Sequence, residues 1–235
     1  MIKTELVDNH FEFSVNGIKC GYDGVVVWRI NEDGHEESIG SFEDIKFIEQ
    51  TSHCVVFFSE GLGEYLSFNG EKFGGISTIK FDIIPAHNEN LPQMPNGEIW
   101  EQICFIIDGE DIIDNLGNWS IETSCFLVQK DDFFKGKLLI GICGCTCGGC
   151  SDIVADVDQS ENYIFWKVYY ARNQDRNTIY IFNKKDYENA LNEISNKSAR
   201  KEEDAGEWAS FILSHVKKEL LEKIEKGKYY EQYNK

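Results

Sequence analysis

The chain has 235 residues, 42% of them hydrophobic and 13% aromatic, which supplies enough apolar material for one large domain or two small ones and excludes a disordered chain. Its 41 acidic and 23 basic side chains give a net charge of −18, which repels phosphate backbones and disfavours a nucleic-acid-binding protein. No run of about 18 apolar residues is present, so we expect no membrane-spanning segment.

The first part of the chain is predicted to be mainly β. Phe11–Val15 alternates apolar and polar residues, and Asn16-Gly17 after it is the signal of a type I′ hairpin turn. Val25–Ile30 is typical of a buried strand and ends at the turn sequence Asn31–Gly34.

A short helix is predicted next, because Ser41 stands three residues before Asp44 as in a helix N-terminal capping pair. Its apolar face would consist of Phe42, Ile45 and Ile48. Further short strands are predicted at 54–58, 65–68 and 79–83.

All three prolines lie between Pro85 and Pro95. Because proline suits neither a central strand nor a helix interior, residues 85–97 are predicted to connect two units. These are a mainly β unit at 1–84 and an α+β unit at 98–235 that carries a cysteine-rich loop. A single sandwich crossed by this connection is the alternative.

The second part mixes strands and helices. A strand at 99–107 is predicted to lead through Asp108-Gly109 into a short helix with Ile112, Ile113 and Leu116. A second helix begins after Asn183 as its N-cap, with Tyr187, Leu191 and Ile194 on one face. Strands are predicted between the two helices at 138–142, 152–157, 163–170 and 178–182.

The last 40 residues favour one long amphipathic helix from about Glu202 to Lys226, because apolar residues recur every three or four positions. This stripe packs on the protein's own sheet or, alternatively, on a partner. The predicted fold class is therefore α+β, with mainly antiparallel sheet, short helices and a long C-terminal amphipathic helix.

Four of the eight cysteines lie within eight residues, at Cys143, Cys145, Cys147 and Cys150. Four thiolates match the tetrahedral ligand set of structural zinc, so these residues are the candidate metal ligands. Structural zinc usually joins two separated cysteine pairs, however, and the glycines of this loop also suit close packing of small residues. Redox thiols are a third interpretation, although the neighbours of Cys147 and Cys150 are not basic.

Residues from about 103 to 194 also carry a pattern of motifs: a strand ending in Asp-Gly, an apolar strand, a Gly-x-Cys-Gly-Cys loop with a further Gly-Cys, a Trp-bearing hairpin and a Phe-x4-Tyr-x2-Ala-Leu helix start. They stand here at Ile107–Asp111, Leu138–Ile140, Gly141–Cys145, Gly149-Cys150, Trp166 and Phe182–Leu191. This order resembles an uncharacterised family of bacterial proteins. The resemblance implies a small soluble domain and assigns no activity, so no catalytic residue is carried over.

Other catalytic patterns are weak. Asp156–Asn162 begins like a calcium loop but has Glu161 where the loop needs glycine and Lys167 where it needs glutamate. The five histidines are scattered, although a cysteine–histidine pair formed in space remains an alternative. We therefore expect no enzyme, no catalytic or cofactor-binding residue and no cofactor, with zinc as the alternative.

The distribution of charge points to a binding role. Residues 1–95 carry 6 basic and 16 acidic side chains (net −10), 96–195 carry 8 and 17 (net −9), and 196–235 carry 9 and 8 (net +1). An acidic body favours encounter with a basic protein, although acidity that only keeps the chain soluble explains the same composition. We predict an acidic binding protein of the immunity or inhibitor type that occludes a basic partner, and alternatively a zinc module centred on Cys143–Cys150. The first residues lack the apolar stretch of a signal peptide, so we expect it in the cytoplasm.

Overall fold

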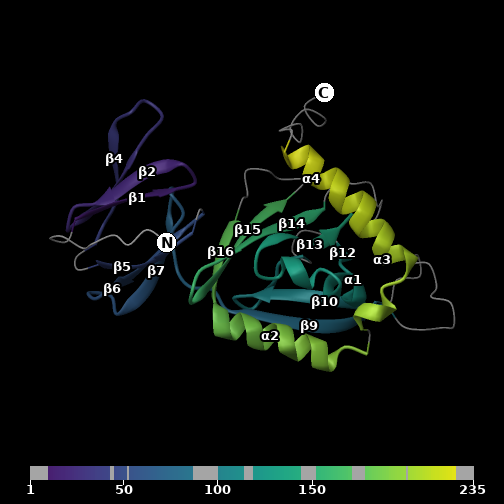
Figure 1. The fold of residues 1–235 in the computed structure, drawn as a ribbon. Coiled ribbons are helices and arrows are strands. Elements are labelled where there is room, and N and C mark those ends of the chain that lie inside the picture. The colour runs from purple at the N-terminus through teal and green to yellow at the C-terminus, as the bar shows by residue number, and fades with distance from the viewer. Residues whose placement is uncertain are drawn as a thin grey trace. The chain divides into compact units, whose positions relative to one another are not determined.

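The computed structural model describes residues 10–42, 45–51, 53–86, 100–113, 119–143, 152–170, 178–199 and 201–225 (Figure 1). The chain divides into two compact units, Met1–Ile76 with Gln159–Phe165, and Ser77–Asp158 with Trp166–Lys235. Antiparallel sheets dominate and the helices are short, which confirms the coarse fold class. No helix among the described residues is long and apolar enough to cross a membrane.

The first unit contains two four-stranded antiparallel sheets, in which each strand pairs with the next one along the chain. The first sheet consists of β1 (Phe11–Val15), β2 (Ile18–Tyr22), β3 (Val26–Ile30) and β4 (Glu36–Ser41). The second consists of β5 (Ile45–Gln50), β6 (Val55–Ser59), β7 (Glu64–Phe68) and β8 (Phe73–Gly74).

The predicted hairpin at the start of the chain is confirmed. Asn16 and Gly17 have φ angles of 51° and 77°, as a type I′ turn requires, and they join β1 to β2. Alternate residues of β1 face inward, where Phe11 and Phe13 pack against Phe57. An aromatic cluster thus fills the core of this unit.

Two predictions for this unit are wrong. The segment around Ser41 forms the end of β4 and the start of β5 instead of a helix, because Ile45 and Phe47 face the core with the two-residue period of a strand. Glu43 and Asp44 lie outside the described residues. The run at 25–30 forms a strand as predicted, but Val25 is 50% exposed and only Val27 is fully buried.

The remaining described strands form a five-stranded and a three-stranded sheet. The five-stranded order is β12 (Trp119–Ser120), β13 (Gly136–Ile142), β14 (Ile153–Gln159), β15 (Tyr163–Tyr170) and β16 (Thr178–Asn183). The three-stranded order is β11 (Glu110–Asp111), β10 (Trp100–Ile107) and β9 (Ile79–Ala86).

Helices cover these sheets. Helix α2 (Lys184–Lys197) runs along β9, and Asn183 caps it as predicted by accepting a hydrogen bond from the Lys185 N–H at 3.0 Å (Figure 1). Helix α1 (Thr123–Leu127) and the 3-10 helix η2 (Lys130–Asp132) precede β13. The core between the elements contains Phe81, Phe105, Phe126, Trp166 and Tyr187.

The predicted connection at 85–97 does not coincide with the division between the units, because the first stretch of the first unit ends at Ile76. Strand β9 continues to Ala86 and pairs antiparallel with β10, so the residues between them join two strands of one sheet instead of two units. Pro85 is tolerated because β9 is the edge strand of its sheet. Residues 87–99 lie outside the described part of the chain.

The helix predicted after Asp108-Gly109 is also wrong. These two residues have φ angles of 52° and 86° and form a tight turn from β10 back into β11, as a type I′ hairpin does. Ile112 and Ile113 are buried after this turn, whereas Leu116 lies outside the described residues.

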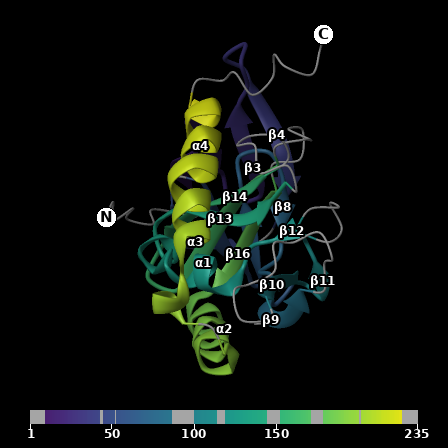
Figure 2. The same ribbon diagram turned by 90° about the vertical axis from the view of Figure 1, so that its right-hand side faces the viewer.

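Residues 202–225 are largely helical without forming a single α-helix. The described part consists of a short 3-10 helix η3 (Glu202–Asp204), α3 (Glu207–Phe211), the π-helical segment η4 (Ile212–Lys217) and α4 (Lys218–Glu225). The last three follow one another as one continuous helical segment (Figure 2). The longest α-helix described is therefore α2, with 14 residues, and the wider turns of η4 interrupt the predicted one.

Candidate functional site

The predicted cysteine site is described only at its base. Cys145, Cys147 and Cys150 lie outside the described residues, whereas half-buried Cys143 directly follows β13. Its backbone N–H donates to Oδ1 of Asp152 at 2.8 Å, and Asp152 is fully buried just before β14. This carboxylate therefore closes the base of the cysteine loop. Within the described ranges, no group of three or more His, Cys, Asp and Glu is placed to hold a metal.

The other described thiols lie inside the protein. Cys20, Cys54, Cys104 and Cys125 are all buried. Burial raises the pKa of Cys20 to about 11 and the pKa values of Cys54 and Cys125 to about 12. Cys20, Cys54 and Cys125 are therefore neutral thiols at pH 7 and act as small packing residues, because nucleophilic attack requires the thiolate.

The β3–β4 hairpin carries a concentration of acidic side chains. Residues 26–41 contain one arginine, Arg29, and four carboxylates: Glu32, Asp33, Glu36 and Glu37. Arg29 pairs with Glu37, with its Nη2 at 2.9 Å from Oε2. Glu32, Asp33 and Glu36 are exposed and make no ion pair with any described residue.

Hydrogen bonds hold the turn of this hairpin in one shape. Oδ1 of Asn31 accepts from the backbone N–H groups of Asp33 at 3.1 Å and His35 at 2.9 Å, and the Asn31 N–H donates to the His35 carbonyl at 2.9 Å. In Figure 1 the turn extends beyond the neighbouring ends of β1 and β2. The carboxylates are thus presented on an ordered, projecting turn, which lowers the entropy lost when a partner binds.

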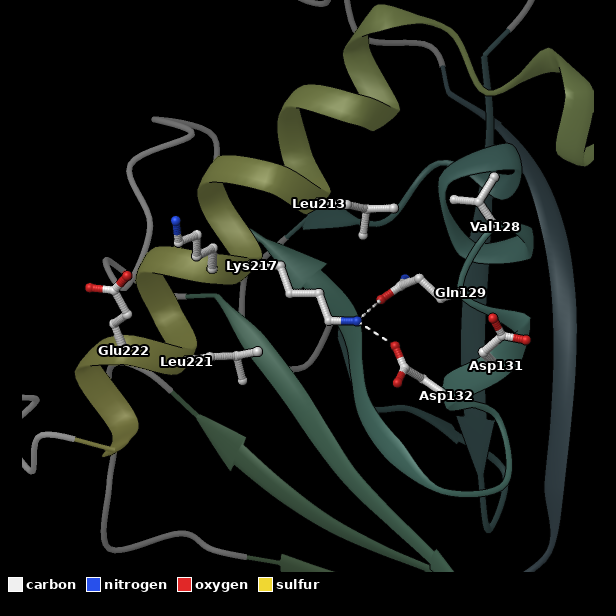
Figure 3. A pocket seen from close by; sticks show the side chains of 9 residues that line it. Val128, Gln129, Asp131, Asp132, Leu213, Lys217, Leu221 and Glu222 are labelled. Atoms are coloured by element: carbon white, nitrogen blue, oxygen red, sulfur yellow. Dashed lines mark hydrogen bonds and ion pairs between the residues drawn. The ribbon is translucent and has the colours of Figure 1, made fainter.

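A cavity of about 520 Å³ lies in the second unit, between η2 and the C-terminal helical segment (Figure 3). Leu213, Lys217 and Leu221 line it at four-residue intervals from the helical side. Lys217 reaches across to donate to Oε1 of Gln129 at 3.0 Å and to Oδ2 of Asp132 at 2.6 Å (Figure 3). Its side chain is only 13% exposed.

Gln129 supports this cavity from the opposite side. Its side-chain amide is buried, accepts from the Leu139 N–H at 3.0 Å and donates to the Leu139 carbonyl at 3.1 Å, as a neighbouring strand would. Gln129 therefore pairs the edge of β13 and holds Lys217 at the same time. The charged lining residues are Asp131, Asp132, Glu222, Lys217 and Lys218, with a formal sum of −1.

The hydrogen bonds of Lys217 with Gln129 and Asp132 mainly anchor the C-terminal helical segment. An ammonium has three N–H donors, and Lys217 uses two of them within the described structure, so one donor is left for an acceptor that enters the cavity. The mixed charges provide no strong selection for an anion or a cation. The projecting carboxylates of the β3–β4 hairpin are the stronger candidate for recognition.

The sequence pattern predicts neither the contact between Gln129 and Lys217 nor which carboxylates of the β3–β4 hairpin lack an ion pair among the described residues. Gln129 and Lys217 are 88 residues apart, and no local pattern links them. The one available signal was the row Leu213, Lys217 and Leu221 beside the buried row Ile212, Val216 and Leu220. A lysine between two leucines at helical spacing indicates a half-buried cation that needs a partner.

No protein-family model, curated protein or solved structure matches this chain. A functional conclusion therefore follows from the chain's own residues.

Proposed function

We propose that this chain is a non-enzymatic acidic binding protein of the inhibitor or immunity type, which occludes a basic protein partner in the cytoplasm. The observation that carries the proposal is the β3–β4 hairpin, where Glu32, Asp33 and Glu36 are exposed at and beside an ordered turn and make no ion pair with any described residue. The net charge of −18 acts in the same direction, since it attracts a basic surface over distances longer than a contact.

The mechanism is electrostatic steering followed by steric occlusion. A single pair of charges 4 Å apart in water contributes only about 1 kcal/mol, and salt at 0.15 M screens charges beyond about 8 Å. Carboxylates therefore supply the association rate and orientation, and apolar contacts must supply much of the affinity. Val25, which is 50% exposed just before β3, is one side chain available for such a contact.

The helical segment 207–225 has a supporting role in this proposal. Its buried row, Ile212, Val216 and Leu220, packs within the second unit. In this proposal the whole segment works as one amphipathic element, with its apolar stripe used inside the chain instead of on the partner.

The test is capture of a partner from cells that produce the chain, with a neutral-hairpin variant as the comparison. This variant is Glu32→Gln/Asp33→Asn/Glu36→Gln. A control variant, Glu64→Gln/Glu71→Gln/Glu203→Gln, removes the same charge from exposed carboxylates elsewhere.

A basic protein held by the wild type and the control but released by the neutral-hairpin variant, and whose own activity the wild type blocks, supports the proposal. A partner held equally by all three chains, or one whose activity is unaffected, contradicts it.

A zinc module is the second candidate, because the Asp152 carboxylate holds the Cys143 backbone at the base of the cysteine loop. A fixed base reduces the entropy lost when Cys143, Cys145, Cys147 and Cys150 gather around one ion. Metal analysis of the purified chain tests this. One zinc per chain, lost in Cys143→Ser/Cys145→Ser but kept in Cys104→Ser, supports it; a metal-free chain that folds and binds its partner contradicts it.

A further inference from the structure

Strand β4 is the outer edge of the first sheet in the part of the chain that the structure describes. The sheet order is β1-β2-β3-β4, so β3 is the one described strand that hydrogen-bonds to β4. The opposed pairs are Ile30 with Glu36, Arg29 with Glu37 and Trp28 with Ser38.

The hydrogen bonds of the turn fix which backbone groups of β4 face outward. Asn31 and His35 form a hydrogen-bonded pair, because the Asn31 N–H donates to the His35 carbonyl. Hydrogen-bonded and non-hydrogen-bonded pairs alternate along an antiparallel ladder. The next pair, Ile30 with Glu36, is therefore non-hydrogen-bonded, and so is Trp28 with Ser38. The N–H and C=O groups of Glu36 and Ser38 consequently point away from β3.

The open stretch ends at a bulge. The pairing shifts between Val27 and Trp28, which leaves Ile39 as the extra residue of β4, and Ile39 packs against the core. Beyond it, a Cβ placed on Gly40 would lie 2.7 Å from the Phe42 ring and 3.1 Å from the Phe73 ring. These rings pack over one face of β4 at Gly40, and the bulge ends the regular pairing edge. The regular open edge among the described residues is thus Glu36–Ser38.

Charge decides what can pair with this edge. Two copies of the chain joined edge to edge at Glu36–Ser38 would bring the Glu36 carboxylates of the two copies close together, which is repulsive. A segment rich in lysine or arginine instead gains charge pairs and backbone hydrogen bonds together.

We propose that the Glu36–Ser38 edge of β4 accepts an extended, lysine- or arginine-rich segment of the partner as an additional short strand, an inference that rests on the proposed function. The backbone groups of Glu36 and Ser38 bond one strand of the partner, and the hairpin carboxylates select its basic side chains. The bulge at Ile39 limits the pairing to this short stretch, so affinity depends on both contributions.

The experiment uses the full chain and a defined probe, the acetylated and amidated peptide (Lys-Val)4, followed by NMR of the backbone amides. We expect the probe to shift and protect the Glu36 and Ser38 amides. Ser38→Pro removes one outward N–H donor without touching the β3 ladder, and it should weaken binding about tenfold. The control variant Glu64→Gln/Glu71→Gln/Glu203→Gln should stay within about twofold.

A second probe covers the case in which Ser38→Pro does not fold. The same peptide with all its backbone nitrogens methylated keeps its charges and loses its N–H donors, and it should bind at least about tenfold more weakly.

Equal binding of the methylated and unmethylated peptides overturns strand pairing. Failure of the unmethylated peptide to bind overturns it as well. In both cases the partner-capture test still decides the proposed acidic binding function. Binding of the peptide that neither the neutral-hairpin variant nor Ser38→Pro weakens also overturns the edge assignment. If no partner is captured at all, the proposed function fails whatever the peptide does.

Discussion

Replacing Gln129 by alanine tests whether one side chain completes the edge of β13 and anchors the C-terminal helical segment. Gln129→Ala leaves the N–H and C=O of buried Leu139 without their partner at this edge, and Lys217 loses one of its two acceptors. An unsatisfied buried polar group costs about 1–3 kcal/mol, and water entering through the adjoining cavity recovers part of that cost. The expected loss of unfolding free energy is therefore about 2–4 kcal/mol.

Urea denaturation followed by circular dichroism measures this loss as a lower midpoint at an unchanged slope. The matched control is Lys218→Ala, which changes an exposed residue that lines the same cavity and should cost less than about 0.5 kcal/mol. A Gln129→Ala chain as stable as the wild type would refute the claim that Gln129 stabilises the edge of β13 and anchors Lys217.

Three further predictions concern packing, capping and pH. Gly21→Ala should destabilise the first unit by about 1–3 kcal/mol in urea, because the new Cβ would lie 2.1 Å from the Trp28 ring; a neutral result would show that this ring moves freely. Asn183→Ala should cost about 1 kcal/mol through loss of the α2 cap, and an unchanged midpoint would argue against the cap. The unfolding free energy should fall as pH rises above 9, because the unfolded chain then loses thiol protons that the folded chain keeps. In the folded chain burial raises the pKa of Cys54 and Cys125 to about 12. An unfolding free energy that is constant from pH 9 to 11 would contradict their burial.

Local signals in the sequence predict the structure correctly where one short segment decides it. Asn16-Gly17 specifies a turn with two positive φ angles, and Asn183 specifies a cap, whatever the rest of the chain does. The helix predicted at Ser41 is wrong because the inward packing of Ile45 and Phe47 outweighs the local capping signal. That packing is a tertiary effect. The connection predicted from Pro85 is wrong because only the sheet order shows that β9 is an edge strand, where proline is tolerated.

The candidate site was predictable only in part. The overall acidity of the body is visible in composition, but which carboxylates lack a cation depends on pairs such as Arg29 with Glu37. The alternation that turns the backbone groups of Glu36 and Ser38 outward follows from register, and register follows from the turn. The metal prediction for Cys145, Cys147 and Cys150 stays a prediction, because these residues lie outside the described part of the chain.

The central claim, that carboxylates of the β3–β4 hairpin bind a basic macromolecule, is tested most directly by titrating the captured partner at increasing salt concentration. The wild-type affinity should fall steeply with salt, and the neutral-hairpin variant should bind more weakly with a shallower dependence. The same affinity and the same salt dependence for both chains would contradict the claim.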